Sequence, residues 1–244
     1  MAEKKVNVAI VGASGYSGEE LVRLLLEHPH VNLSVLTSRQ YAGQTMTSVF
    51  PRFAGYNHAA DLKFSSPSID VLSEKADVVF LALPHGIAAE FAVPLANKGV
   101  TVIDLSADFR INDAAIYKEF YGNEHPEPQW LTKAVYGLPE IHRAAIANAT
   151  LIASPGCYPT SILLPTIPLI KKGLIDTNQI IANSMSGVSG AGRNASVPFL
   201  YVECNESLRP YGVPKHRHLS EIEQEMGIAN GAPVTIEFTP HLVP

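Results

Sequence analysis

The stretch Val6-Asn-Val-Ala-Ile-Val11-Gly12-Ala-Ser-Gly15-Tyr-Ser-Gly18 decides the fold of this chain. The apolar run 6–11 predicts a strand buried in a sheet, and the segment 18–27 predicts a helix with a broad apolar side. The glycines between them permit a tight turn, and the helix N-terminus offers N–H groups and a positive dipole end. Strand, glycine turn and helix in this order predict a site for the pyrophosphate of a dinucleotide. A tight turn without a ligand is the alternative interpretation.

The alternation of strand and helix continues through the first part of the chain. Further strands are predicted at 31–36, 77–83 and 100–105, and a helix is predicted at 87–98. Strand–helix–strand units imply a parallel sheet with right-handed crossovers. We therefore expect an α/β fold, a Rossmann-type doubly wound parallel sheet, and assign residues 1–150 to this nucleotide-binding domain.

The pattern changes after about residue 140, where short predicted strands are separated by long stretches rich in Gly, Pro and His. Ser220-Glu-Ile-Glu223 is a capping-box pattern, which predicts a short helix that opens there and ends before Gly227. We expect an α+β catalytic domain over 151–244. Its last predicted strand is followed by no segment that could pair with it, so we expect this domain to be incomplete at the C-terminus. The strands of this part are predicted at 151–153, 180–185 and 234–238.

The composition excludes several classes of partner. The 18 Lys and Arg residues against 23 Asp and Glu residues give a net charge of −5, which argues against nucleic acid and anionic membrane surfaces. The most apolar stretch, 162–170, is too short to cross a bilayer, and the N-terminus leads straight into a strand. The two cysteines are too few for a disulfide scaffold or a cysteine-based zinc site. We expect a cytoplasmic protein with reduced thiols and a small anionic substrate.

The residues after the second predicted strand bear on the choice of cofactor. An NAD-selective site usually carries an acid there to hold the ribose 2′-hydroxyl, but this strand ends in Thr37-Ser38-Arg39. A hydroxyl and a guanidinium can instead hold a 2′-phosphate, so we predict NADP; a solvated Arg39 is the alternative. The predicted cofactor-binding residues of the first domain are Gly12, Ser14, Gly15, Tyr16, Ser17, Gly18, Ser38, Arg39, Pro84 and His85, the last two at the carboxyl end of a sheet strand.

Cys157 is the predicted nucleophile. It lies in Ser154-Pro-Gly-Cys-Tyr-Pro159, at a predicted turn from strand to helix, where the helix dipole stabilises a thiolate. A buried, inert thiol is the alternative, and it is the interpretation favoured for Cys204, which lies in a mostly apolar stretch without a turn signal.

A thiol nucleophile needs an acid or base nearby, and Lys215-His216-Arg217-His218 is the candidate segment. We expect only one of the two histidines to face the sulfur, with His218 favoured and His216 second. A flexible surface histidine is the alternative for each. A metal site of His216, His218 and His241 lacks a recognisable ligand spacing, and we predict no metal.

A second glycine-rich stretch, Ser186-Gly-Val-Ser-Gly-Ala-Gly-Arg193, has no strand–helix unit around it. We interpret it as backbone that approaches a ligand closely, with Ser189 and Gly190 near the nicotinamide. The cations available for an anionic substrate are Arg110, Arg193, Lys215 and Arg217, with a solvated face as the alternative for each.

Taken together, these residues give the chain a resemblance to the N-acetyl-γ-glutamyl-phosphate reductases of arginine biosynthesis. The segments that match span almost the whole chain in the family's order, and Gly156-Cys-Tyr-Pro-Thr160 and Ser186–Arg193 are the most specific. The resemblance implies NADPH-dependent reduction of N-acetyl-glutamyl 5-phosphate to the semialdehyde, with a thioester on Cys157 and a proton exchanged by a histidine that matches His218 best. It also implies more chain beyond Pro244, which puts the activity of this chain in doubt. We expect a homo-oligomer.

Three other functions remain open. A related reductase acting on aspartyl or carrier-bound aminoadipyl phosphate would share the cysteine chemistry. A non-catalytic nucleotide-binding remnant would bind the cofactor without turnover. A short-chain dehydrogenase needs Tyr-x-x-x-Lys on a helix, and the one match, Tyr211-Gly-Val-Pro-Lys215, contains residues that a regular helix excludes.

Overall fold

The structure is a computed structural model that describes residues 5–56 and 58–244. The chain divides into two compact units. Unit 1 consists of Met1–Phe109 and Pro126–Ser154, and unit 2 consists of Arg110–His125 and Pro155–Pro244. Within the described residues, no helix is both long enough and apolar enough to cross a membrane.

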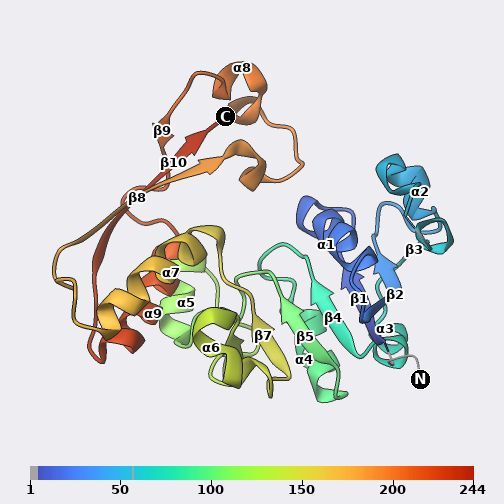
Figure 1. The fold of residues 1–244 in the computed structure, drawn as a ribbon, viewed down its shortest axis with the longest axis horizontal. Helices are drawn as coiled ribbons and strands as arrows, with labels where there is room; N and C mark the ends of the chain where they lie inside the picture. The colour runs from blue at the N-terminus through green and yellow to red at the C-terminus, as the bar shows by residue number, and fades with distance from the viewer. Residues whose placement is uncertain (1–4, 57) are drawn as a thin grey trace. The chain divides into compact units, whose positions relative to one another are not determined.

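Unit 1 is built on a seven-stranded sheet in the order β3-β2-β1-β4-β5-β7-β6, with every neighbouring pair parallel (Figure 1). The strand order reverses between β1 and β4, because the chain builds outward from β1 to β3 and then returns. This confirms the predicted Rossmann-type doubly wound sheet. The strands are β1 Val6–Val11, β2 Val31–Thr37, β3 Phe64–Ser65, β4 Val78–Leu81, β5 Thr101–Asp104, β6 Val135–Tyr136 and β7 Leu151–Ala153.

The helices of unit 1 connect these strands. The first begins at Tyr16, two residues before the predicted start, with Gly15 as its N-cap. The helices and 3-10 turns are α1 Tyr16–Leu26, α2 Met46–Val49, η1 Pro51–Phe53, η2 Ala59–Asp61, α3 Ile69–Lys75, α4 Ala89–Asn97, η3 Pro128–Trp130 and α6 Pro139–Ile146.

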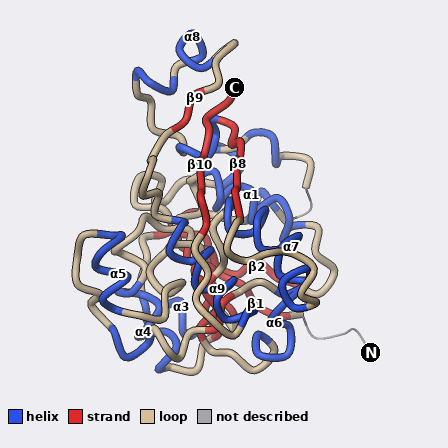
Figure 2. Tube along the Cα trace, turned by 90° about the vertical axis from the view of Figure 1, so that its left-hand side faces the viewer, coloured by secondary structure: helices blue, strands red, loops and turns tan. Residues whose placement is uncertain are grey.

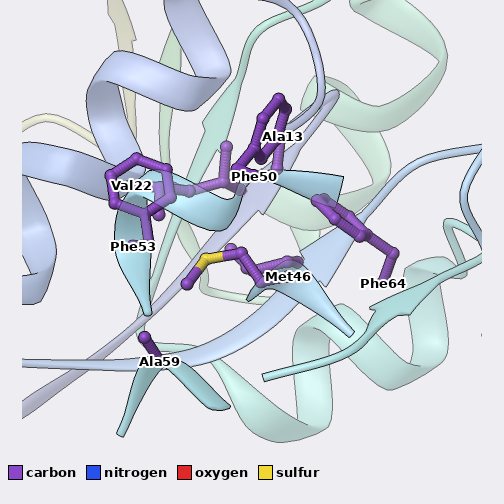
Figure 3. Close-up of a cluster of buried hydrophobic side chains, with 9 residues drawn as sticks. Ala13, Val22, Met46, Phe50, Phe53, Ala59 and Phe64 are labelled. Atoms are coloured by element: carbon purple, nitrogen blue, oxygen red, sulfur yellow. The ribbon is translucent and has the colours of Figure 1, made fainter. Parts of the chain in front are cut away.

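The segment between β2 and β3 packs an aromatic cluster against the sheet. Figure 3 shows Met46 among the rings of Phe50, Phe53 and Phe64. The Phe50 ring lies edge-on to both other rings, with centroids 6.2 Å apart in each pair. Burial of each such side chain stabilises the fold by about 1.5–3 kcal/mol, so this cluster anchors the β2 edge of the sheet.

Unit 2 has a three-stranded mixed sheet in the order β8-β10-β9. Figure 2 shows β8 and β10 side by side, and the two run parallel over eight paired residues, while β9 is antiparallel to β10. The last strand is therefore flanked by two strands that precede it in the chain. Unit 2 contains α5 Ala114–Tyr121, α7 Cys157–Lys171, β8 Ile180–Gly187, η4 Val188–Ala191, η5 Val197–Phe199, α8 Tyr201–Cys204, β9 Arg209–Pro210, α9 His218–Asn230 and β10 Ile236–Val243.

The predicted bounds of α9 are wrong at both ends. The helix begins at His218, because His216 Nδ1 accepts the His218 N–H at 3.1 Å. Ser220 lies inside the helix and donates to the carbonyl of Arg217, so it caps nothing. The helix also runs through Gly227 and ends at Gly231, whose φ of 72° lies in the left-handed region typical of helix ends.

Candidate active site

A cavity of about 290 Å³ lies in unit 1 at the carboxyl ends of β1, β2 and β4. This is the edge of an open parallel sheet, beside the point of strand reversal, where ligands bind. Its lining includes Gly12, Ser14, Ser38, Arg39 and Pro84 from the predicted set. Gly15, Tyr16 and Ser17 do not line it; they form the cap and first turn of α1.

Two glycines of the first turn are required by close packing. Gly12 has a φ of 84°, and a Cβ there would lie 2.3 Å from the carbonyl oxygen of Ala82. A Cβ on Gly18 would lie 2.3 Å from the Gly12 oxygen and 2.6 Å from the Ala13 Cα. These clashes are with backbone, so a side chain at Gly12 would push the turn away from the end of β4, and one at Gly18 would push α1 away from the turn.

The polar wall of this cavity comes from the end of β2. Ser38 Oγ and Ser14 Oγ are hydrogen-bonded at 2.9 Å, and Arg39 is exposed at the rim. Thr37 Oγ1 is buried without a hydrogen-bond partner in the structure. The cavity lining within the described chain includes no carboxylate.

The loop after β4 is fixed from behind by the segment that follows β5. The Gly86 N–H donates to Asp108 Oδ1 at 2.7 Å, and the Ala107 N–H donates to His85 Nδ1 at 2.8 Å. Pro84 lines the cavity as predicted, but the His85 ring does not; one of its nitrogens supports the neighbouring loop.

A second cavity, of about 580 Å³, lies in unit 2 and contains Cys157. Cys157 is exposed and is the first residue of α7, with Gly156 as N-cap. Negative charge is favoured at this position by the helix dipole and by first-turn N–H groups that have no partner within the helix. Pro159 in the first turn has its φ already set for the helix.

His218 lies behind the Cys157 turn. It is buried, as the first residue of α9, and lines the same cavity. A Cβ on Gly156 would lie 2.7 Å from His218 Nε2 and 2.8 Å from Glu221 Oε1, so only glycine lets these side chains approach.

Glu221, one helical turn along α9, is fully buried and contacts three groups. Its Oε1 lies 3.1 Å from an Arg110 guanidinium nitrogen and 3.9 Å from His218 Nε2. Its Oε2 accepts the Gly156 N–H at 3.3 Å. Glu221 thus joins the cysteine turn, the histidine and Arg110. No sequence signal marked Glu221 for a role. A helix that starts at His218 puts Glu221 three residues on, along the same helix face.

His216 and His218 both line the cavity, so the expectation that only one histidine would face it is wrong. Their ring centroids are 4.8 Å apart. Residues two apart on an extended segment share a face, so direction alone could not separate the two. Burial, with a smaller effect from the neighbouring Arg217 charge, lowers the pKa of His216 to about 4. Since its Nδ1 accepts the His218 N–H, His216 is a neutral cap for α9.

Tyr211 and Tyr158 add a pair of hydroxyls to the cavity wall. Tyr211 donates to the Tyr158 hydroxyl at 3.0 Å, and Tyr158 donates to the His241 carbonyl at 3.2 Å. Burial and the bond to Tyr158 raise the pKa of Tyr211, so its hydroxyl stays protonated. Tyr211–Lys215 is not helical, which excludes the short-chain dehydrogenase arrangement.

The cations predicted to bind substrate are divided by the structure. Lys215 and Arg217 line the cavity, although Lys215 also pairs with Glu119 at 2.7 Å. Arg193 is exposed and does not line it. Arg110 was expected to bind the substrate, but it is buried and does not line the cavity. Its guanidinium pairs with the Glu221 carboxylate instead.

Other predicted and unpredicted residues complete the cavity. Gly190 lines it and Ser189 does not. Arg209 and Phe199 also line it, and no sequence signal marked them. Cys204 is buried at the end of α8, as expected for a structural thiol, although this stretch forms two short helical turns. The described residues contain no cluster of His, Cys, Asp and Glu that could hold a metal ion.

Two family patterns match successive parts of the chain. Residues 7–149 match "Semialdehyde dehydrogenase, NAD binding domain", and residues 157–244 match "Semialdehyde dehydrogenase, dimerisation domain". Among solved structures, aspartate semialdehyde dehydrogenase II from Vibrio cholerae aligns with a TM-score of 0.70 at 20% identity, covering 99% of this chain and 71% of that one. The enzyme from Candida albicans, solved with NADP, aligns with a TM-score of 0.63 at 15% identity, covering 99% of this chain and 68% of that one. The fold is thus that of the semialdehyde dehydrogenases.

Relatives with higher sequence identity identify the family within this fold. The N-acetyl-gamma-glutamyl-phosphate reductase of Akkermansia muciniphila is 57% identical over 99% of this chain and 70% of its own length. The protein of the same name from Moorella thermoacetica is 50% identical over 98% of this chain and 68% of its own length. The chain belongs to the N-acetyl-gamma-glutamyl-phosphate reductase family.

Proposed function

We propose that this chain reduces N-acetyl-glutamyl 5-phosphate to N-acetyl-glutamate 5-semialdehyde with NADPH and releases phosphate. The observation that carries the proposal is the exposed Cys157 at the start of α7, in one cavity with His218. The names of the relatives support the substrate. We further propose a cytoplasmic homo-oligomer, for which the match to a dimerisation domain is the support.

The protein's part in the reaction starts at the sulfur. The Cys157 thiolate attacks the acyl carbon, the carbon–oxygen bond to phosphate breaks, and a thioester remains on Sγ. The N–H groups of Cys157 and Tyr158 face the developing oxyanion from the first turn of α7. Lys215, Arg217 and Arg209 are the cavity cations that suit the anionic groups of the substrate.

Protonated His218 then donates its proton to the oxygen of the reduced adduct. It takes the proton back as the carbon–sulfur bond breaks, the aldehyde leaves and the thiolate is restored. His218 fits this task better than His216, because His216 is a neutral cap whose Nδ1 is occupied.

The cavity of unit 1 fits NADP. Gly12 and Gly18 keep the turn narrow, and Ser14, Ser38 and Arg39 offer polar groups without a carboxylate beside them. When bound, the reduced nicotinamide supplies the hydride for the thioester. Loss of the Arg39 charge in Arg39→Ala should weaken NADPH binding about tenfold and leave NADH binding unchanged. Unchanged NADPH binding would assign Arg39 to the solvated surface, and equal weakening of both cofactors would place it against a part that they share.

Trapping of the thioester tests the proposed function. The protein is mixed with the acyl phosphate without NADPH, and the mass of the peptide that carries Cys157 is measured. We expect an acyl adduct that Cys157→Ser abolishes and Cys204→Ser, the matched buried thiol, leaves unchanged. Cofactor binding without an adduct would favour a nucleotide-binding remnant, and faster acylation by aspartyl phosphate would favour the related reductase.

A further inference from the structure

We propose that Arg110 and Glu221 form a charge-balanced positioning pair for His218, in which Arg110 limits the pull of the Glu221 carboxylate on the imidazole. Neither residue touches the reacting atoms in this proposal. It rests on the proposed function, since the assigned task of His218 is to give up and recover a proton.

The geometry gives Glu221 two tasks. Its Oε2 accepts the Gly156 N–H at 3.3 Å, and this fixes the N-cap of the helix that presents Cys157. Its Oε1 lies 3.9 Å from His218 Nε2, close enough to favour the imidazolium strongly in a buried site. A histidine whose cation is stabilised too strongly would be a weak acid and would donate its proton to the reduced adduct too slowly.

Arg110 opposes this pull. Its guanidinium lies 3.1 Å from the same Glu221 oxygen that faces His218, and both side chains are almost fully buried. The field that reaches the imidazole is therefore that of a paired carboxylate rather than a lone one. The pair also explains why the Arg110 cation is buried instead of facing the cavity.

The other titratable or charged groups near His218 come from several elements. From α7, Cys157 shares its cavity and the Tyr158 ring lies 5.9 Å away. From the preceding loop, the neutral His216 ring lies 4.8 Å away, and the charged Arg217 and Lys215 face the cavity. Arg209 of β9 also lines this cavity. Tyr211 faces the cavity as a protonated hydroxyl. None of these is altered by the test variants.

The test is a titration of the His218 ring by NMR in the full chain, with the His218 signal assigned from its loss in His218→Gln. Glu221→Gln removes the carboxylate and should lower the midpoint by about one pH unit. Arg110→Gln leaves the carboxylate unopposed and should raise the midpoint by about one pH unit. The double variant should fall between the two. Lys118→Gln, which removes an exposed cation of unit 2 paired with Glu124, is the matched control and should not move it.

Shifts in the same direction, or no shift in either variant, would overturn the proposal. If a single variant does not fold, Glu221→Asp keeps the charge but retracts it from His218 and should also lower the midpoint; an unchanged midpoint there counts against us equally. Substrate binding by Arg110 would instead raise KM in Arg110→Gln with the midpoint unmoved. Opposite shifts in a protein that forms no Cys157 adduct would leave this pair standing and refute the proposed function alone.

Discussion

Single residues at the Cys157 turn are fixed by contacts far away in the chain. Gly156 has a φ of −66°, which any residue adopts, so its backbone does not explain why it is glycine. The reason is the approach of His218 and Glu221 from α9. Sequence patterns identified Cys157 because a turn between strand and helix is a local signal, but they could not show Glu221 behind it, since that contact spans 65 residues.

Gly156→Ala should therefore damage the site without straining the backbone. The added methyl group would lie 2.7 Å from His218 Nε2, so the histidine or the turn must move. We expect a loss of roughly 100-fold in kcat/KM, the scale set by misplacement of a catalytic group by about 1 Å. Gly55→Ala, where a Cβ meets open space, is the control for kinetics and thermal unfolding. Full activity in Gly156→Ala would show that the packing around His218 is dispensable.

The neutral His216 makes the fold sensitive to acid. Its pKa is about 4 in the folded chain against 6.5 as the ordinary value, so between these pH values the unfolded chain binds a proton that the folded chain does not. The contribution of His216 to the free energy of unfolding should have its full value above about pH 6.5. It should fall by about 1–2 kcal/mol as the pH drops toward 4, after allowance for the half-exposed ring.

His216→Asn separates this effect from the capping role. The amide oxygen can accept the His218 N–H in place of Nδ1 but does not titrate. Urea unfolding at pH 7 and pH 5 should show a smaller difference between the two pH values in His216→Asn than in the unaltered chain. The same difference in both proteins would assign the acid sensitivity to other groups.

At the scale of elements, local rules predicted the strands better than the ends of the helices. The strand predicted at 6–11 has the same bounds as β1, because a buried parallel strand shows as a run of apolar side chains in the sequence. The start of α9 was missed, because Ser220-Glu-Ile-Glu223 satisfies a capping rule that the His216 contact overrides. Glu223, the other end of that pattern, accepts the N–H of Ile236, the first residue of β10.

Two glycines of α9 allow the corrected helix end to be tested with the same substitution. Gly227 lies inside the helix, where a Cβ would meet its nearest neighbour at 3.5 Å, an ordinary contact. Gly227→Ala should stabilise the chain by about 0.5–1 kcal/mol. Gly231 has a left-handed φ of 72°, so Gly231→Ala should destabilise it by about 1 kcal/mol. Equilibrium unfolding measures both; loss of stability in Gly227→Ala would restore the shorter predicted helix.

At the scale of the whole molecule, the sequence predicts the two units to different extents. The glycine turn and the strands β1, β2, β4 and β5 follow from short-range pattern. The strand 151–153 was expected in the second domain, but it is β7 of the unit 1 sheet, and the two-residue strands β3 and β6 carried no signal. In unit 2, β10 pairs with β8 across more than fifty residues and with β9 across a segment that contains α9, so no single segment of the sequence predicts the sheet or its order. What the sequence did carry there was chemistry: Cys157 and the histidines lie in one cavity.

One face of the unit 2 sheet bears on assembly. Ile181 and Met185 of β8 are 67% and 68% exposed on the same side of the strand, within the residues that match a dimerisation domain. If a second copy covers this face in the proposed homo-oligomer, Ile181→Lys should lower the mass measured by sedimentation velocity, because a buried lysine without a partner is costly. Leu174→Lys changes an equally exposed leucine in the loop after α7 and should leave the mass unchanged. An equal mass for Ile181→Lys and the unaltered chain would place the interface elsewhere, and a monomeric unaltered chain would refute the oligomer itself.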